Sequence, residues 1–210
     1  MTPLVPPRSR GQAWFELTGV VPLGLFVVVH LASYASVLAG ADTFGVASGG
    51  VLFLVLEVAL VWLPLAIHAG YGLRRLWARL EPDPAERARS VVLRASGGLA
   101  LAFIAAHVAY FRVPLLRGRI APEDLAELLA ARFSSTVDGV PWFAIVHLLG
   151  VAAVTAHLGL GLERFLCRSG IARVRSARRF SFLVAGLSFC VGSATVVALA
   201  TGSALPRFLY

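Results

Sequence analysis

Five long runs of apolar residues divide this chain, and no other feature restricts its fold as strongly. Each run has the roughly 20 residues that an α-helix needs to cross the hydrocarbon core of a bilayer. Barrel strands are disfavoured, because the runs are too long and their apolar residues do not alternate. Only 14% of the residues are charged, against roughly a quarter in soluble domains. We therefore expect an all-α integral membrane bundle, a single membrane-anchor domain over residues 1–210, with five transmembrane helices at approximately 17–38, 51–77, 91–114, 141–167 and 180–200.

The arginines between these runs are distributed unequally. Fourteen of the 19 basic residues lie in the N-terminal tail and in the links that follow the second and fourth runs. The other five lie in the 112–140 connection and at Arg207, and the only charge in the 40–50 loop is Asp42. Cytoplasmic segments carry the excess of basic residues, so we expect a cytoplasmic N-terminus and an external C-terminus. The net charge of +8 then reflects topology and not nucleic-acid binding.

Two segments outside the main pattern need a separate interpretation. The first run follows basic residues, as a signal peptide does, but it is too long for a signal core and is expected to remain as an uncleaved helix. The stretch "PEDLAELLAARF" at 122–133 places apolar residues at helical spacing after a proline and two acids. It predicts a short amphipathic helix on the outer surface, either a simple cap or a lid over a site.

All five histidines lie inside the expected helices, where polar side chains usually face the interior of the bundle. His68 and His157 lie six and seven residues from the arginine at the cytoplasmic end of their runs. At 1.5 Å per residue, both are about 10 Å deep. His107 and His30 lie thirteen and fourteen residues from the flanking charge, about 20 Å deep. The spacing thus predicts an inner pair and an outer pair.

Two imidazoles at one depth on facing helices are what a six-coordinate b-type haem requires, since each supplies one axial nitrogen. No carboxylate or thiolate joins either layer, so a site for a bare metal ion is less favoured. Small residues near the histidines would leave room for the macrocycle, although they also serve ordinary helix packing; they are Gly70, Gly72, Gly97, Gly98, Gly159 and Gly161. Cys167 and Cys190 show no metal-binding spacing and are interpreted as packing residues.

Two further polar residues remain inside the helices. His147 lies about 25 Å from the cytoplasmic end and about 80° around the helix from His157. Spacing slightly prefers His30 with His107 and leaves His147 as an alternative outer ligand, a propionate or quinone contact, or a packing residue. Glu57 lies eleven residues before His68, which places it near the depth of the outer histidine pair. Its carboxyl group is expected to be neutral, paired, or part of a proton path or quinone site.

Several stretches resemble a known family. They are "GVVPLGLFVVVH" at 19–30, "LEVALVWLPLAIHAGYG" at 56–72, "ASGGLALAFIAAHV" at 95–108 and "TAHLGLG" at 155–161. They resemble the haem-bearing helices of the five-helix, dihaem cytochrome b membrane subunit of succinate dehydrogenase and fumarate reductase. "RSARRFSF" at 175–182 is similar to that family's entry to its last helix. The resemblance covers nearly the whole chain.

The resemblance implies which histidines bind haem iron. His68 and His157 would hold the haem nearer the cytoplasm, and His30 and His107 would hold the distal one. This agrees with the pairing by depth, and the family's pattern requires no ligand at His147.

The resemblance also implies partners and a reaction. A flavoprotein and an iron–sulfur subunit would dock on the cytoplasmic face of a bacterial inner membrane, and menaquinone would be the substrate. We therefore expect an electron relay from the iron–sulfur subunit to menaquinone through two haem b groups, with no succinate site in this chain. Some fumarate-reducing relatives have a glutamate close before the proximal histidine; here Thr155 and Ala156 stand there, which favours succinate oxidation. The alternatives are a fumarate reductase subunit, the haem b anchor of a hydrogenase or formate dehydrogenase, and a transporter without haem.

Overall fold

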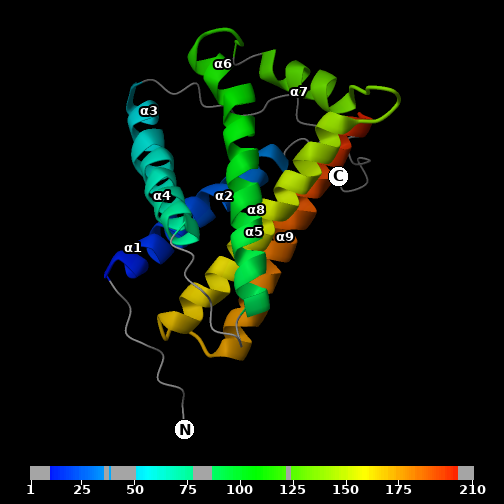
Figure 1. Cartoon of the computed structure of the whole chain (residues 1–210). Coiled ribbons are helices and arrows are strands. Elements are labelled where there is room, and N and C mark those ends of the chain that lie inside the picture. The colour runs from blue at the N-terminus through cyan, green and yellow to red at the C-terminus, as the bar shows by residue number, and fades with distance from the viewer. Residues whose placement is uncertain (1–9, 36–37, 39–50, 78–86, 122–123, 203–210) are drawn as a thin grey trace, which may run out of the picture. The chain divides into compact units, whose positions relative to one another are not determined.

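A computed structural model describes residues 10–35, 38, 51–77, 87–121 and 124–202. The predicted loop at 40–50 with Asp42, most of the second link, and Arg207 lie outside the described residues. Five described helices are long and apolar enough to cross a membrane (Figure 1): Trp14–Tyr34, Leu54–Trp77, Arg87–Leu116, Trp142–Arg168 and Val174–Thr201. The prediction of an all-α chain with five membrane-spanning helices is confirmed, and the chain is a multi-pass membrane protein.

Each of the first three spans consists of two α-helical segments joined by a π-helical turn. In chain order these are α1 (Arg10–Thr18), η1 (Gly19–Leu23) and α2 (Gly24–Tyr34); α3 (Val51–Glu57), η3 (Val58–Trp62) and α4 (Leu63–Trp77); and α5 (Arg87–His107), η5 (Val108–Arg112) and α6 (Val113–Leu116). The last two spans are continuous helices, preceded by a short one: α7 (Leu125–Ser134), α8 (Trp142–Arg168) and α9 (Val174–Thr201).

Prolines explain the interrupted spans. Pro22 lies inside η1, and Pro64 and Pro114 each follow a π-helical turn by two residues. Proline has no N–H, and its ring clashes with the carbonyl group four residues earlier. A π-turn inserts one extra residue and moves that carbonyl away. At all three prolines the local disturbance of the helix is a π-turn.

The chain divides into two compact units, and the three longest helices contribute residues to both. The first unit is Met1–Val27, Gly49–Ser96 and Ala156–Ala185; the second is Val28–Ser48, Gly97–Thr155 and Gly186–Tyr210. His68 and His157 belong to the first unit, whereas His30, His107 and His147 belong to the second. A single domain over the whole chain stays a prediction.

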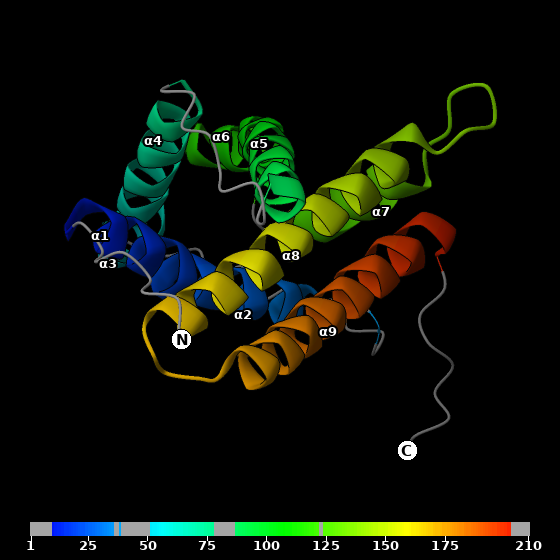
Figure 2. The same cartoon turned by 60° about the horizontal axis from the view of Figure 1, so that its bottom comes forward.

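Close helix contacts characterise the first unit. There α1 packs against α4, and α8 lies beside α9 (Figure 2). A Cβ on Gly159 would lie 2.8 Å from the Cβ of Ala185, so this glycine permits the close approach of α8 and α9. Of the two roles expected for Gly159, helix packing is therefore the one that its contacts support.

The second unit contains an apolar cluster around α7. The buried face of this helix presents Leu125, Leu129 and Phe133 at intervals of four residues. These side chains pack with Phe111 of η5, Ala144 of α8, and Val196 and Leu199 of α9. The predicted short helix is present, and its apolar face packs on other helices of the second unit. Its place on the outer surface stays a prediction.

Candidate functional site

The inner histidines face one another within the first unit. His68 lies on α4 and His157 on α8, with their ring centres 6.0 Å apart and their planes at 76°. The sequence placed these two residues at one depth on different helices. The structure adds that their rings are neighbours.

Both inner histidines use Nδ1 in a hydrogen bond to the backbone of another helix. The Nδ1 of His68 lies 2.9 Å from the carbonyl oxygen of Phe15 on α1. The Nδ1 of His157 lies 3.1 Å from the carbonyl oxygen of Leu93 on α5. A carbonyl oxygen only accepts, so Nδ1 must carry the proton in both rings. Each Nε2 therefore keeps its lone pair, which is the tautomer that metal-ligating histidines have.

Neighbouring groups hold the His68 ring further. The Phe15 ring stacks on it, with centres 4.3 Å apart and an interplanar angle of 10°. Gly19 faces the ring from η1 so closely that an added Cβ would overlap the imidazole atoms. Sequence reasoning missed both contacts, because neither residue type is polar. The only signal was a glycine inside the apolar stretch before Pro22.

The outer histidines have a similar ring separation within the second unit, but the buried Nδ1 of His107 has no hydrogen-bond partner among the described residues. His30 lies on α2 and His107 at the end of α5, and their ring centres are 6.1 Å apart at 87°. The ring of Tyr34, one turn after His30 on α2, lies 4.9 Å from the His30 ring. The separation of this pair therefore nearly equals that of the inner pair.

His147 on α8 also lies near His107. Their ring centres are 5.7 Å apart. The Nδ1 of His147 donates to the carbonyl oxygen of Phe143, one turn earlier on the same helix, at 2.8 Å. Its Nε2 is buried and has no hydrogen-bond partner among the described residues. The imidazole is surrounded by four aromatic rings, those of Phe103, Phe111, Phe133 and Phe143.

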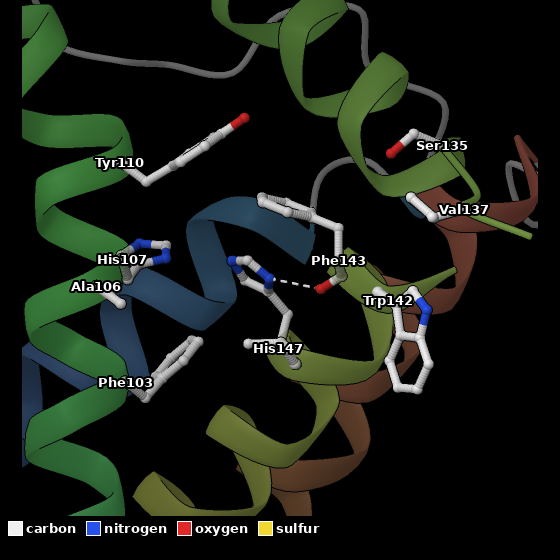
Figure 3. A pocket seen from close by; sticks show the side chains of 10 residues that line it. Phe103, Ala106, His107, Tyr110, Ser135, Val137, Trp142, Phe143 and His147 are labelled. Carbon is white, nitrogen blue, oxygen red and sulfur yellow. Dashed lines mark hydrogen bonds between the residues drawn. The ribbon is translucent and has the colours of Figure 1, made fainter. Parts of the chain in front are cut away.

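A cavity of about 410 Å³ lies beside these residues in the second unit. Figure 3 shows His107 and Tyr110 on one side of it and Phe143 and His147 on the other. Ser135, directly after α7, also lines it. The size of the cavity falls within the range of small-molecule pockets, which are mostly apolar with a few polar groups. Ser135, the residue after α7, therefore borders the cavity, and whether α7 is a lid or a cap stays open.

Glu57 belongs to the first unit, at the end of α3. The indole Nε1–H of Trp62 donates to its Oε1 at 3.1 Å across the η3 turn. The five-residue separation matches the π-helical spacing of that turn. Glu57 and the outer histidines are thus assigned to different compact units, and its contact with a quinone stays a prediction.

The two histidine pairs have the spacing that a haem iron requires. An imidazole nitrogen binds a transition metal at about 2 Å, and its ring centre lies about 1 Å further back. Two imidazoles on opposite faces of one iron therefore have centres about 6 Å apart. The observed separations are 6.0 Å and 6.1 Å. An added Cβ on Gly70, Gly98 or Gly161 would meet nothing within 4 Å. Because Gly70 and Gly98 are exposed, the open space beside them is at the surface, and their role in making room for a macrocycle stays a prediction.

Comparison with known proteins identifies one relative whose name agrees with the resemblance described above. The succinate dehydrogenase cytochrome b558 subunit of Bacillus subtilis (strain 168) is 28% identical over 182 residues, which cover 83% of this chain and 86% of the relative. This chain is a distant, full-length homologue of that subunit. No family model matches the chain, and no solved structure matches it. The resemblance inferred from the haem-bearing stretches is confirmed.

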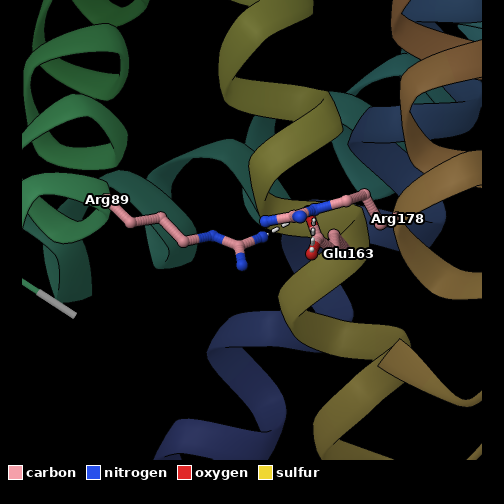
Figure 4. Close-up of polar contacts among 3 residues, drawn as sticks. All are labelled: Arg89, Glu163 and Arg178. Atoms are coloured by element: carbon pink, nitrogen blue, oxygen red, sulfur yellow. Dashed lines mark ion pairs between the residues drawn. The ribbon is translucent and has the colours of Figure 1, made fainter. Parts of the chain in front are cut away.

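Ion pairs near the inner histidines of this cytochrome b558 homologue escaped sequence reasoning. The buried carboxylate of Glu163 on α8 contacts Arg89 of α5 and, at 3.6 Å, Arg178 of α9 (Figure 4). A second buried carboxylate, that of Glu16 on α1, accepts from Arg168 of α8 at 3.1 Å. The sequence showed these residues only as part of a basic cytoplasmic end. Which arginine meets which carboxylate depends on helix contacts that spacing does not determine.

Proposed function

We propose that this chain is the cytochrome b subunit that anchors a bacterial succinate dehydrogenase in the inner membrane and relays electrons from its iron–sulfur subunit to menaquinone. The observation that carries the proposal is the spacing of two histidine pairs, 6.0 Å and 6.1 Å between ring centres. A homologue whose name includes cytochrome b558 and succinate dehydrogenase supports the same conclusion.

His68 and His157 hold the haem nearer the cytoplasm, each through Nε2. Bound haem supplies one-electron transfer by the change of its iron between ferric and ferrous states. The protein's contribution is to present two neutral imidazoles at the correct distance. The carbonyl groups of Phe15 and Leu93 keep both Nδ1 protons in place, so neither ring needs to change tautomer when it binds iron.

His30 and His107 hold the distal haem. Their separation matches that of the inner pair within 0.1 Å. His147 is 5.7 Å from His107, and four phenylalanine rings crowd its imidazole. A macrocycle between His107 and His147 would have to displace part of this aromatic cluster, which costs packing energy.

The cavity between Tyr110 and His147 is the part of the chain that best suits menaquinone. Its lining is mostly aromatic and aliphatic, as a naphthoquinone ring requires. His147 lines this cavity, and its buried Nε2, which has no partner among the described residues, is the candidate acceptor of a hydrogen bond from the reduced quinol. Glu57 is a separate candidate for a quinone contact.

Succinate oxidation is the direction that the residues before His157 support. Thr155, two residues earlier, is buried and donates its hydroxyl to the carbonyl oxygen of Val151 at 2.7 Å. It has no ionisable carboxyl group, so it cannot take the place of the glutamate that some fumarate-reducing relatives have before this histidine.

The flavoprotein and iron–sulfur subunits dock on the arginine-rich cytoplasmic side. The links that follow the second and fourth apolar runs carry most of the basic residues, which the positive-inside rule places in the cytoplasm. They offer a basic surface to soluble partners. Co-purification of both subunits with a tagged form of this chain checks the proposal of a complex.

Haem loss from single variants tests the ligand assignment. We expect His68→Ala and His157→Ala to lose one and the same haem, and His30→Ala and His107→Ala to lose the other. A reduced-minus-oxidised spectrum with a redox titration of each variant identifies the missing component. If His147→Ala removes a haem and His30→Ala does not, the outer assignment is wrong. A native protein without a b-type α-band rejects the haem function altogether.

A further inference from the structure

Two buried ion pairs lie next to the two carbonyl groups that hold the inner histidines. Glu16 follows Phe15, whose carbonyl oxygen accepts from His68. Arg89 stands one helical turn before Leu93, whose carbonyl oxygen accepts from His157. The partners of Glu16 and Arg89 are both on α8, the helix that carries His157.

The Glu163 cluster joins α8 to α5 one helical turn along α5 from the contact with His157. The Glu163 side chain is 3% exposed, and the Arg89 guanidinium reaches it from α5. Figure 4 shows Arg89 and Arg178 approaching the carboxylate from opposite sides. Because α5 and α8 meet both here and at the Leu93–His157 hydrogen bond, the two contacts together determine the register of one helix against the other.

The Glu16–Arg168 pair joins α1 to α8 in the same way. Its carboxylate is 8% exposed and accepts from the guanidinium Nη1 at 3.1 Å. Glu16 is covalently adjacent to Phe15, so any rotation or slip of α1 that breaks the ion pair also moves the carbonyl group that holds His68.

Packing alone does not determine the position of Leu93. A cavity of about 190 Å³ borders it and is also lined by Arg89, Glu163 and Arg168. Interiors without voids resist small shifts, whereas a helix beside a cavity has room to move by a fraction of a turn. The directional contacts across the cavity therefore add to the restraint on α5 at this point.

We propose that the Arg89–Glu163 and Glu16–Arg168 pairs are positioning elements that set the potential of the inner haem by holding the Leu93 and Phe15 carbonyl groups on His157 and His68. The proposal rests on the ligation of haem by these two histidines. A hydrogen bond from Nδ1–H makes an axial imidazole more basic. A more basic ligand stabilises ferric iron, so the hydrogen bonds lower the midpoint potential.

The test compares Arg89→Gln with Arg178→Gln. Both substitutions remove one positive charge from the same carboxylate, and by charge alone both lower the midpoint potential, because a nearby cation disfavours the ferric state. Only Arg89 is on the helix that carries the Leu93 carbonyl group. We expect an upward shift of the inner-haem midpoint in Arg89→Gln and no upward shift in Arg178→Gln, with the distal haem unchanged in both.

Two further variants extend the test. One breaks the Glu16–Arg168 pair, and the other keeps the charge at position 89 as a control for haem loss. Arg168→Gln is expected to raise the same midpoint through Phe15 and His68. Arg89→Lys keeps the charge and is expected to restore the native midpoint. If Arg89→Gln loses the inner haem while Arg178→Gln and Arg89→Lys keep it, the positioning role is supported.

Three results separate the possible failures. If the midpoints in Arg89→Gln and Arg168→Gln are unchanged or lowered, the ion pairs act only through their charge and the inference is overturned. If Arg89→Gln and Arg178→Gln shift the midpoint equally, the special role of α5 is overturned. If His68→Ala and His157→Ala keep both haems, the proposed ligation fails first. All readings come from a redox titration of the purified holoprotein.

Discussion

At the level of single residues, the group that accepts a hydrogen bond from Nδ1–H distinguishes the inner histidines from His147. His68 and His157 donate this hydrogen bond to carbonyl groups on other helices, which makes each ring part of a contact between elements. His147 donates it to its own helix, and phenylalanine rings from α5, η5, α7 and α8 pack around its imidazole. The first arrangement ties an imidazole to a second helix, whereas the second leaves the Nε2 of His147 without a partner among the described residues.

Replacing His147 should affect the quinone and not the haems. We expect His147→Ala to keep both haems and to raise the apparent KM for menaquinone roughly 2- to 10-fold, the effect of one lost hydrogen bond. Steady-state succinate:quinone kinetics measure it in the intact complex. Val146→Ala is the matched control, because Val146 lines the same cavity without a polar atom. Equal changes in both variants would show that His147 contributes only to cavity shape.

Gly19 should tolerate no side chain. A methyl group at this position would overlap the His68 ring, and such overpacking costs about 1–3 kcal/mol. We therefore expect Gly19→Ala to weaken retention of the inner haem, seen as a lower haem-to-protein ratio after mild heating. Gly186→Ala serves as the control, because an added Cβ there meets nothing within 4 Å. A Gly19→Ala protein as stable as this control would contradict the packing described for His68.

The sequence predicted the residues of the site better than their supports. Depth along the helices was enough to pair His68 with His157, because rise per residue is nearly constant in a helix. The carbonyl acceptors could not be predicted, because Phe15 and Leu93 lie 53 and 64 residues from the histidines they contact. Such contacts depend on helix rotation and register, which composition and spacing do not specify.

At the level of elements, prolines and α7 distinguish this bundle from five plain helices. The π-turns beside Pro22, Pro64 and Pro114 shift the faces of the segments on either side of them. The Trp62–Glu57 hydrogen bond across η3 is a direct result, since residues five apart are not aligned in a regular α-helix. Apolar runs predicted the five spans closely, but the residue pattern did not indicate π-helical spacing.

The attachment of α7 should depend on its buried leucine side chains. Leu129 is buried in the cluster with Phe111 and Phe133, and its truncation to alanine should cost about 2–5 kcal/mol. We expect Leu129→Ala to speed amide hydrogen exchange of residues 124–134, measured by mass spectrometry. Leu116→Ala is the comparison, because Leu116 is 55% exposed. If exchange in α7 is the same in both variants, its apolar face does not depend on this packing.

At the level of the whole molecule, the arginine distribution predicts the orientation in the membrane. A single cysteine introduced by Arg173→Cys, in a background lacking Cys167 and Cys190, should react with a membrane-impermeant maleimide only after cells are permeabilised. One introduced by Arg119→Cys should react in intact spheroplasts, because that connection is expected outside. The reverse pattern would place the N-terminus outside and would move the proposed docking face to the wrong side of the membrane.

The number of haems per chain tests the central claim most directly. Two histidine pairs, each with its ring centres about 6 Å apart, predict two b-type haems for every polypeptide. A pyridine haemochrome assay combined with quantitative amino-acid analysis of the purified protein measures this ratio. The account predicts a value of two, and a ratio of one or zero in fully folded protein would contradict it.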